Sequence, residues 1–390
     1  MLGNAKAVRQ SAPRLRTIQD CLKDLPATLR QAGRAANRLR RGRRLLVVMI
    51  GGGTARGKPV FDMRRRDFVA LLGGAVSVWP LAARAQQPAM PVIGLLGSAS
   101  PDFMADRLRA FRQGLSETGF DEGRNVRIEY RWSGSRNDQL PVLAADLVRQ
   151  QVAVIVTLGN TASTLAAKAA TASIPIVFRV AANPVEAGIV ASLAHPGGNL
   201  TGVTTLGVEA GPKQLELLCE LIPTATVVGL LVNPTNPTLA ETQSRDLEAA
   251  AHSLGLQFHV LHASIEADFD PAFASLVRLR AGGLVIGADT FFNSRSELLA
   301  ALATRHAIPT ISPYRDFAAA GGLMSYGGGV VAASRQAGVY TGRILKGERP
   351  ADLPVQQSTK VDLIINVKTA KILGLKVPLT LQVAADEVIE

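Results

Sequence analysis

Small polar side chains gather in the loops that follow the expected β-strands of this 390-residue chain. These loops are "GSASPD", "GNTAST", "AANPVEAG", "NPTNPT" and "ADTFFNSR". In open α/β sheets, ligands bind beside the carboxyl ends of the strands. The hydroxyl, amide and carboxylate groups of these loops therefore predict a binding site for a small polar molecule. The candidate contact residues are Ser98, Ser100, Asn160, Thr161, Ala162, Asn183, Asn233, Asn236, Asp289, Thr290 and Tyr314.

Two of these loops offer opposite chemistry. "GNTAST" opens an expected helix, where backbone N–H groups near Thr161 and Ala162, with the Asn160 side chain, can cradle a carboxylate. Asp289 is the only acid in the quoted loops of the second half, and it is the candidate partner for an ammonium group. Both features have a plainer interpretation, because Asn and Asp are also ordinary helix N-caps. Several aromatic residues can either stack on a ligand or pack in the core, namely Phe291, Phe292, Tyr314 and Tyr326.

The same loops lack the residues that catalysis requires. They contain no nucleophile elbow, no paired His and carboxylate, and no cluster of metal ligands. We therefore expect no enzyme activity, no metal and no cofactor. His252, His259 and His262 are close in sequence, but the first is on an expected helix and the other two are on opposite faces of a strand.

Apolar strands and amphipathic helices alternate along the chain, which is typical of βαβ units. The first series has strands at "PVIGLLG", "NVRIEYRW", "VAVIVTL" and "IPIVFRV", with helices near 103–118 and 140–150, from 161, and after Pro184. The second has strands at "TVVGLLVN", "LQFHVLH", "GGLVIGAD" and "IPTIS", with helices near 239–254 and 269–280 and from 294. Strands that are apolar throughout are expected where helices cover both faces of a parallel sheet. The sequence therefore predicts an α/β protein with two doubly wound lobes.

A leader is expected before the first lobe. Residues 63–85 combine a cationic start, a 14-residue apolar run and a small-residue cleavage site at Ala83 and Ala85. The run is shorter than the roughly 20 residues that a membrane-spanning helix needs. Arg65 and Arg66 precede Asp67-Phe68, which resembles a twin-arginine export signal. Residues 1–62 are interpreted as an over-extended reading frame or a long cationic leader, without a core of their own.

The positive charge of the chain belongs to this leader region. The whole chain has a formal net charge of +12, whereas residues 86–390 contain 25 basic and 27 acidic side chains. Nucleic-acid binding needs basic side chains clustered on a folded face. We therefore expect no nucleic-acid partner.

The segments "GGLMSYG", "RQAGVYTGRILKGERPADLPVQQSTKVDLIINVKTAKILGL" and "ADEVIE" carry a resemblance to a bacterial family. With "PGGNLTGV", the similarity extends from "PVIGLLG" to the last residue. The chain resembles ABC-transporter substrate-binding proteins related to tryptophan- and tyrosine-binding periplasmic receptors. Family members commonly carry an Asp where this chain has Asn183, which leaves the charge of the ligand open.

The resemblance implies the type I periplasmic binding fold, in which three crossover strands join two lobes that close on a small molecule. The crossings are expected near Gly202, Met324 and Gln357. We expect lobe I at residues 90–204 and 322–354, and lobe II at residues 205–321 and 355–390.

The implied function is that of a soluble periplasmic component of an ABC uptake transporter. It would close on an amino acid or related carboxylate and act with a permease in the inner membrane, as a monomer without a stable membrane anchor. A bilobed receptor that signals to a membrane kinase is the alternative. An enzyme on this fold would need a convergent acid, base or nucleophile, and a repressor would need a helix-turn-helix before the first lobe.

Overall fold

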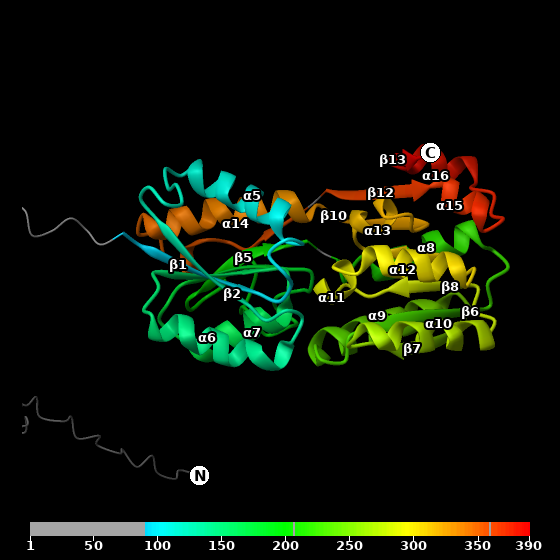
Figure 1. The fold of residues 1–390 in the computed structure, drawn as a ribbon, viewed down its shortest axis with the longest axis horizontal. Helices are drawn as coiled ribbons and strands as arrows, with labels where there is room; N and C mark the ends of the chain where they lie inside the picture. Colours follow the sequence, from blue (N-terminus) through cyan, green and yellow to red (C-terminus); the bar gives the residue numbers. More distant parts are fainter. Residues whose placement is uncertain (1–89, 206, 359) are drawn as a thin grey trace, which may run out of the picture. The chain divides into compact units, whose positions relative to one another are not determined.

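The computed structural model describes residues 90–205, 207–358 and 360–390. The expected signal residues Arg65, Arg66, Ala83 and Ala85, with the rest of the leader, lie outside the described residues. Two separate sheets organise the described chain (Figure 1).

The first sheet has six parallel strands in the order β11-β5-β4-β3-β1-β2. Helices cover both of its faces, α5 and α14 on one and α6 and α7 on the other. We call this sheet and its helices lobe I. Its strands are β1 Val92–Gly97, β2 Arg127–Trp132, β3 Val154–Leu158, β4 Ile176–Val180, β5 Leu200–Thr204 and β11 Gln356–Gln357. Its helices are α5 Ala105–Ser116, α6 Leu140–Arg149, α7 Thr161–Ala170 and α14 Val330–Leu345.

The second sheet has seven strands in the order β13-β12-β10-β9-β8-β6-β7, and we call it and its helices lobe II. Its ladders are parallel except for the antiparallel pair of β10 and β12. The strands are β6 Val227–Val232, β7 Gln257–His262, β8 Gly283–Ile286, β9 Thr310–Ser312, β10 Met324–Gly328, β12 Val361–Asn366 and β13 Glu387–Ile389. The helices are α8 Gly211–Leu221, α9 Pro237–Ser253, α10 Phe269–Arg278, α11 Thr290–Asn293, α12 Ser296–Arg305, α13 Arg315–Ala319, α15 Val367–Ile372 and α16 Leu379–Ala384.

The central strands are apolar because they are covered on both faces. Every residue of β3, β4 and β6 is buried. This confirms the expected class, two doubly wound α/β lobes. One charged residue lies within these three strands, namely Arg179 in the buried strand β4.

Within the described residues the chain passes between the sheets after β5, after β10 and after β11. These passages agree with the three crossings expected near Gly202, Met324 and Gln357. Figure 1 shows α14 beside α5, back in lobe I. The two helices approach closely at Gly114 and Gly338, where a Cβ atom would overlap the backbone of the other helix.

The expected lobe boundaries differ from the sheet membership at two places. We expected residues 322–354 in lobe I, but β10 belongs to lobe II because it pairs with β9 and β12. We expected residues 355–390 in lobe II, but β11 belongs to lobe I because it pairs with β5. Both strands lie next to a crossing, where the sequence does not reveal which sheet offers the hydrogen-bonding edge.

The prediction of a helix after Pro184 is wrong. Residues 184–188 form turns, with Ala187 N–H donating to Asn183 O and Ile189 N–H donating to Pro184 O. Gly188 has a φ of 65°, a left-handed conformation that interrupts a right-handed helix. The helical conformation therefore does not continue beyond a single turn.

Candidate functional site

The loops at the carboxyl ends of the two sheets are in direct contact. From lobe I, the Asn137 side-chain amide donates to Thr235 Oγ1 of lobe II at 3.0 Å. From lobe II, the Thr290 hydroxyl donates to the Gly159 carbonyl of lobe I at 2.5 Å. The structure thus brings together strand-end loops that are far apart in the sequence.

A buried network of amides surrounds Asp289. Asn236 Nδ2 donates to Asp289 Oδ2 at 3.1 Å, and Asn233 Nδ2 approaches Asp289 Oδ1 at 3.3 Å. Asn236 Nδ2 also lies 3.5 Å from Asn160 Oδ1, which belongs to lobe I. Asn233, Asn236, Asn160 and Asp289 are all buried. Four of the sequence-predicted residues therefore meet in one polar cluster that spans the two lobes.

Asp289 is also the N-cap of α11, because its carboxylate accepts the Phe291 N–H at 2.8 Å. Burial is the main cause that raises the pKa of Asp289, while bonds from Phe291, Asn236 and Asn233 act in the opposite direction. No basic side chain among the described residues lies within ion-pair distance of it. The N-cap role expected as the plainer interpretation is present, and within the part of the chain that the structure describes the buried carboxylate has no counter-charge.

Arg179 is the residue that our sequence analysis missed. Its side chain extends from β4 next to Gly159, whose missing Cβ leaves room for the guanidinium group. Arg179 is only 3% exposed, and Arg179 Nε has no hydrogen-bond partner among the described residues. No acid in the described chain forms an ion pair with it. The signal was present in the sequence, as a single arginine in the apolar strand "IPIVFRV".

Burial lowers the pKa of Arg179 to about 10, and the positive charge of Arg107 acts in the same direction. The guanidinium remains a cation at neutral pH. A buried cation without a counter-ion is costly, and the usual solution is a partner that carries the opposite charge. This position therefore favours an anion.

Two hydroxyls of lobe I have unmet hydrogen-bonding capacity. Ser98 follows β1 and Thr161 opens α7, and both are buried. Neither Ser98 Oγ nor Thr161 Oγ1 has a partner among the described residues. Buried polar groups are normally hydrogen-bonded, so such exceptions indicate a water molecule or a ligand.

Tyr314 is buried at the start of α13. Burial raises the pKa of its hydroxyl, and the negative charge of Asp289 acts in the same direction. The positive charges of Arg179 and Arg107 oppose this rise. Tyr314 thus shares the electrostatic environment of both the buried acid and the buried cation.

The structure gives three other candidates local roles. Ser100 is exposed, and its hydroxyl approaches the Phe103 N–H at 3.4 Å. Asn183 Oδ1 accepts the Val185 N–H at 3.1 Å and so stabilises a turn. The Ala162 N–H, expected to face a ligand carboxylate, donates to Asn160 Oδ1 at 2.7 Å. The ordinary N-cap interpretation of Asn160 therefore describes this contact.

The aromatic candidates divide in a similar way. Phe291 and Phe292 pack against each other and against Phe269 in the core of lobe II. Tyr326 packs against another core cluster of the same lobe. Tyr314 is left as the aromatic candidate beside the charged residues.

The polar cluster does not resemble a metal centre. The part of the chain that the structure describes has no group of three or more His, Cys, Asp or Glu side chains placed to hold a metal ion. The chemistry offered by the site is instead a cation and hydroxyl donors from lobe I, and a carboxylate from lobe II. Such an arrangement can bind a molecule that carries both an anionic and a cationic group.

The sequence model of a family described as ABC transporter substrate binding protein matches residues 93–389. The chain belongs to this family. The match covers both lobes, so the family assignment applies to the whole described fold. None of the helices in the described residues has the length and apolar character needed to cross a membrane.

Known proteins are similar to this ABC substrate-binding protein in sequence or in fold. A tyrosine-binding protein of Clostridioides difficile strain R20291 is 27% identical over 269 residues, which is 69% of this chain and 76% of that protein. The ABC domain of a Streptococcus pneumoniae protein, solved in complex with L-Trp, is 22% identical with a TM-score of 0.70, covering 77% of this chain and all of that one. A Clostridium difficile substrate-binding protein with adhesive properties, solved in a ligand-free, open form, is 25% identical with a TM-score of 0.55, covering 77% and 99%.

Proposed function

We propose that this protein is the solute receptor of an ABC uptake transporter and encloses an α-amino acid between the two lobes. The observation that carries this proposal is a buried arginine in one lobe and a buried aspartate in the other. Arg179 belongs to lobe I and Asp289 to lobe II, and neither has an ion-pair partner among the described residues. A zwitterion supplies a counter-charge to each of them.

The carboxylate of the ligand would bind to lobe I. A guanidinium group binds a carboxylate through two parallel N–H donors, and this geometry is stronger than a neutral hydrogen bond. The Ser98 and Thr161 hydroxyls would donate to the same carboxylate, which would satisfy groups that lack partners among the described residues. One ligand group would thus satisfy three buried donors.

The ammonium group of the ligand would bind to Asp289 in lobe II. The carboxylate of Asp289 is already oriented by Phe291, Asn233 and Asn236, so little side-chain entropy would be lost on binding. The relatives named as binding tyrosine or solved with L-Trp support an amino acid as the solute class. Because each half of the ligand contacts a different lobe, the full set of contacts exists only when the lobes are together.

Delivery of the solute requires export and a permease. We propose that residues 63–85 direct export, that the processed protein begins near Gln86 and works in the periplasm, and that it then docks on an inner-membrane permease. Replacement of Arg65 and Arg66 by lysine should retain the precursor in the cytoplasm if the twin-arginine route is used. Unchanged export would indicate the general secretory route.

The ligand class can be tested with protein purified from its natural compartment. Native mass spectrometry should detect a co-purified small molecule, and a thermal-shift screen of amino acids should find one that stabilises the protein. A ligand whose concentration is 100 times its dissociation constant raises the free energy of unfolding by about 2.7 kcal/mol.

Analogues of the best ligand then test the two charges separately. The decarboxylated amine lacks the partner of Arg179, and the N-acetyl derivative lacks the partner of Asp289. Both analogues should bind far more weakly than the parent amino acid. Equal binding of the parent and both analogues, or stabilisation by sugars but by no amino acid, would contradict the proposal.

A further inference from the structure

An ion pair joins the two lobes at a second place. Arg107 of α5 in lobe I contacts Asp316 of α13 in lobe II, with 2.9 Å between Nη2 and Oδ2. The Arg107 side chain is 6% exposed and that of Asp316 is 46% exposed. The pair is therefore partly shielded from water, which strengthens it relative to a pair on the open surface.

Arg107 is held in position by its own lobe. Its Nη1 donates to the Phe103 carbonyl at 3.0 Å, and its guanidinium carbon lies 4.2 Å from the centre of the Phe103 ring. These contacts do not involve lobe II, so they persist when the lobes separate. The guanidinium is thus oriented toward lobe II before any contact forms, which reduces the entropy lost on pairing.

The partner side is similarly prepared. Asp316 lies in the first turn of α13, where a negative charge is favourable. The amide of Asn293 lies next to both charged groups. In the orientation that satisfies both of them, it accepts from Arg107 Nη2 at 2.7 Å and donates to Asp316 Oδ2 at 3.2 Å.

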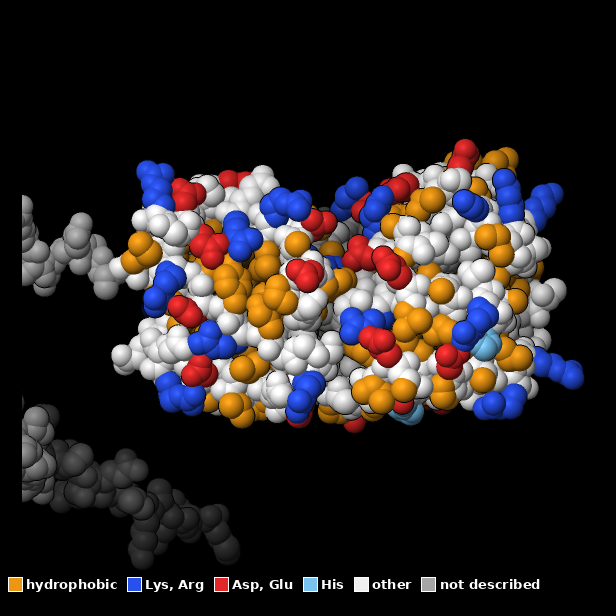
Figure 2. All heavy atoms as spheres, in the orientation of Figure 1, with side chains coloured by type: hydrophobic (Ala, Val, Ile, Leu, Met, Phe, Trp, Pro, Cys, Tyr) orange, Lys and Arg blue, Asp and Glu red, His pale blue; other side chains and the backbone are white. Residues whose placement is uncertain are grey.

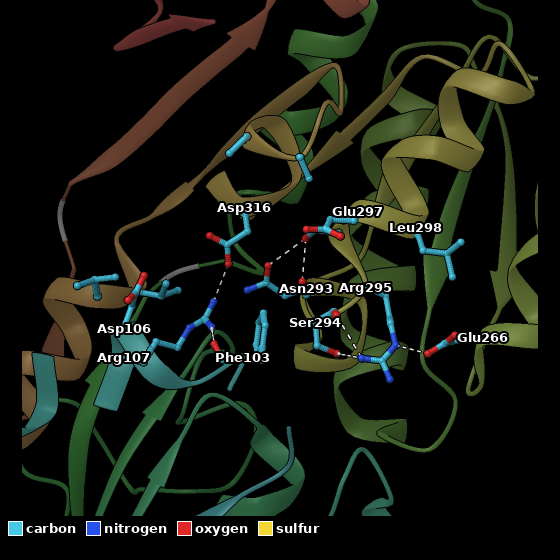
Figure 3. Close-up of a pocket in the computed structure, with 15 residues that line it drawn as sticks. Phe103, Asp106, Arg107, Glu266, Asn293, Ser294, Arg295, Glu297, Leu298 and Asp316 are labelled. Atoms are coloured by element: carbon cyan, nitrogen blue, oxygen red, sulfur yellow. Dashed lines mark hydrogen bonds and ion pairs between the residues drawn. The ribbon is translucent and has the colours of Figure 1, made fainter. Parts of the chain in front are cut away.

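These three residues line a groove of about 590 Å³ (Figure 3). Figure 3 shows Arg107 pointing from lobe I toward Asp316 and Asn293 of lobe II. Neither Arg179 nor Asp289 lines this groove. The ion pair therefore lines a groove that the charged residues proposed to bind the ligand do not line, although the charge of Arg107 still reaches Arg179.

We propose that Arg107 and Asp316, with Asn293, form an interlobe latch that stabilises the closed protein and lengthens the residence time of the ligand. The latch exists only when the lobes are together, so it contributes free energy to the closed form and none to the open form. This inference rests on the proposed function in one respect, namely that closure accompanies ligand binding. Arg107 and Asp316 are positioning residues and need not touch the ligand.

The effect on affinity follows from this coupling. If binding requires closure, removal of the latch lowers the closed population, and the apparent dissociation constant rises by the same factor. We expect Arg107→Met and Asp316→Asn each to weaken ligand affinity about 5- to 50-fold. Most of the change should appear as faster ligand dissociation, because the latch forms late, as the lobes come together.

A double-mutant cycle separates the latch from other roles of either residue. The Arg107→Met/Asp316→Asn variant should bind no more weakly than the weaker single variant, because both changes remove the same contact. Additive effects would overturn the proposal, since they would show that the two side chains act independently.

A second interlobe ion pair supplies a matched control. Arg245 Nη2 of lobe II lies 3.6 Å from Glu186 Oε2 of lobe I, and the two side chains are 67% and 54% exposed. Exposed pairs contribute little, so Arg245→Met should change affinity less than about threefold. An equal loss in Arg245→Met and Arg107→Met would contradict a specific role for the shielded pair.

The ligand-free protein gives a test that does not depend on the identity of the ligand. Small-angle X-ray scattering should show a larger radius of gyration for Arg107→Met and Asp316→Asn than for the unmodified protein and Arg245→Met. Weaker ligand affinity with no change in the free protein's scattering and no change in dissociation rate would overturn the latch. If no amino acid binds but the scattering differs as expected, the proposed ligand class fails while the latch is supported.

Discussion

The two sides of the candidate site differ in how far their polar groups are already satisfied. Lobe I presents Arg179, Ser98 and Thr161, and each has a polar atom without a partner among the described residues. Lobe II presents Asp289, whose carboxylate already accepts bonds from Phe291, Asn233 and Asn236. Unmet donors indicate a ligand more strongly than an acceptor that the protein itself has satisfied. The anion-binding half of the site is therefore better supported than the cation-binding half.

The same contrast predicts how substitutions in each lobe should change ligand affinity and protein stability. A buried arginine without a counter-ion among the described residues is destabilising, and a bound anion would remove that penalty. Asp289 caps α11 and accepts hydrogen bonds from Asn233 and Asn236, so it also contributes to the stability of the ligand-free protein. Substitutions in lobe I should therefore reduce affinity at little cost to stability, whereas substitutions of Asp289 should affect both.

The largest effect is expected for Arg179→Met, which removes the charge and keeps an apolar side chain. Affinity for the amino acid should fall by about 3 to 5 kcal/mol, while the free energy of unfolding of the ligand-free protein should stay the same or rise. Calorimetry and urea unfolding measure the two quantities. Arg131→Met is the control, because Arg131 already pairs with Asp146 at 2.8 Å and should not affect binding. A large loss of stability in Arg179→Met with unchanged affinity would make Arg179 a structural residue.

Asp289→Asn should have the next largest effect on binding. Affinity should fall by about 2 to 3 kcal/mol, because the ammonium loses a charged partner but keeps a carbonyl acceptor. Asp289→Ala should also destabilise the ligand-free protein by about 1 to 3 kcal/mol, because the amides of Asn233 and Asn236 and the Phe291 N–H lose their acceptor. Full affinity in both variants would restrict Asp289 to its capping role.

The pH dependence follows from the raised pKa of Asp289. In the ligand-free protein, a raised pKa means that the neutral carboxyl is favoured, so this residue's contribution to stability decreases as pH rises through that pKa. A bound ammonium reverses the preference, so amino-acid affinity should fall as pH is lowered through the same range. Calorimetry from neutral pH to about pH 4 tests this, with Asp289→Asn as the control that should lose the dependence. A flat profile in the unmodified protein would remove the ammonium from this position.

Smaller effects are expected for the two hydroxyls. Ser98→Ala and Thr161→Val should each weaken binding by about 0.5 to 1.5 kcal/mol. The ligand-free protein should stay nearly as stable, because neither hydroxyl has a hydrogen-bond partner among the described residues. Thr157→Val is a matched control. The Thr157 hydroxyl already bonds to that of Thr164 at 2.8 Å, so its loss should reduce stability and spare affinity. Reduced stability with unchanged affinity in Ser98→Ala and Thr161→Val would show that these hydroxyls stabilise the fold and do not bind the ligand.

The smallest effects on binding are expected for Ser100→Ala and Asn183→Ala. Both side chains bond to backbone N–H groups of their own loops, so affinity should stay within about 0.5 kcal/mol of the unmodified protein. A ligand titration of both variants checks this. A tenfold loss in Asn183→Ala would return Asn183 to the ligand site.

The surface of the described chain agrees with the nearly equal numbers of basic and acidic side chains in residues 86–390. Figure 2 shows acidic and basic side chains interspersed on the face that it displays, without a continuous basic patch. Many of these groups form exposed pairs, such as Arg335 with Glu117 and Arg315 with Glu387. Such pairs contribute little stability individually.

The sequence alone determined the repeating βαβ order, the two lobes and the edge of each sheet where the polar loops lie. These features follow from local periodicity and from the rule that strand-end loops of parallel sheets share one edge. The same logic placed Asn160, Asn233, Asn236 and Asp289 among the candidates, and the structure brings them together.

Only the tertiary structure decided which polar groups are free to bind a ligand. Ala162 and Asn183 have the right residue types or positions, but the hydrogen bonds of the Ala162 N–H and the Asn183 Oδ1 are made within their own loops. Arg179 lies inside an apolar strand next to Gly159, and within the described residues its Nε has no hydrogen-bond partner. The Arg107–Asp316 pair joins residues separated by 209 positions. Local sequence patterns reveal periodicity and caps, but the burial of a charge and the identity of its partner depend on how distant segments pack.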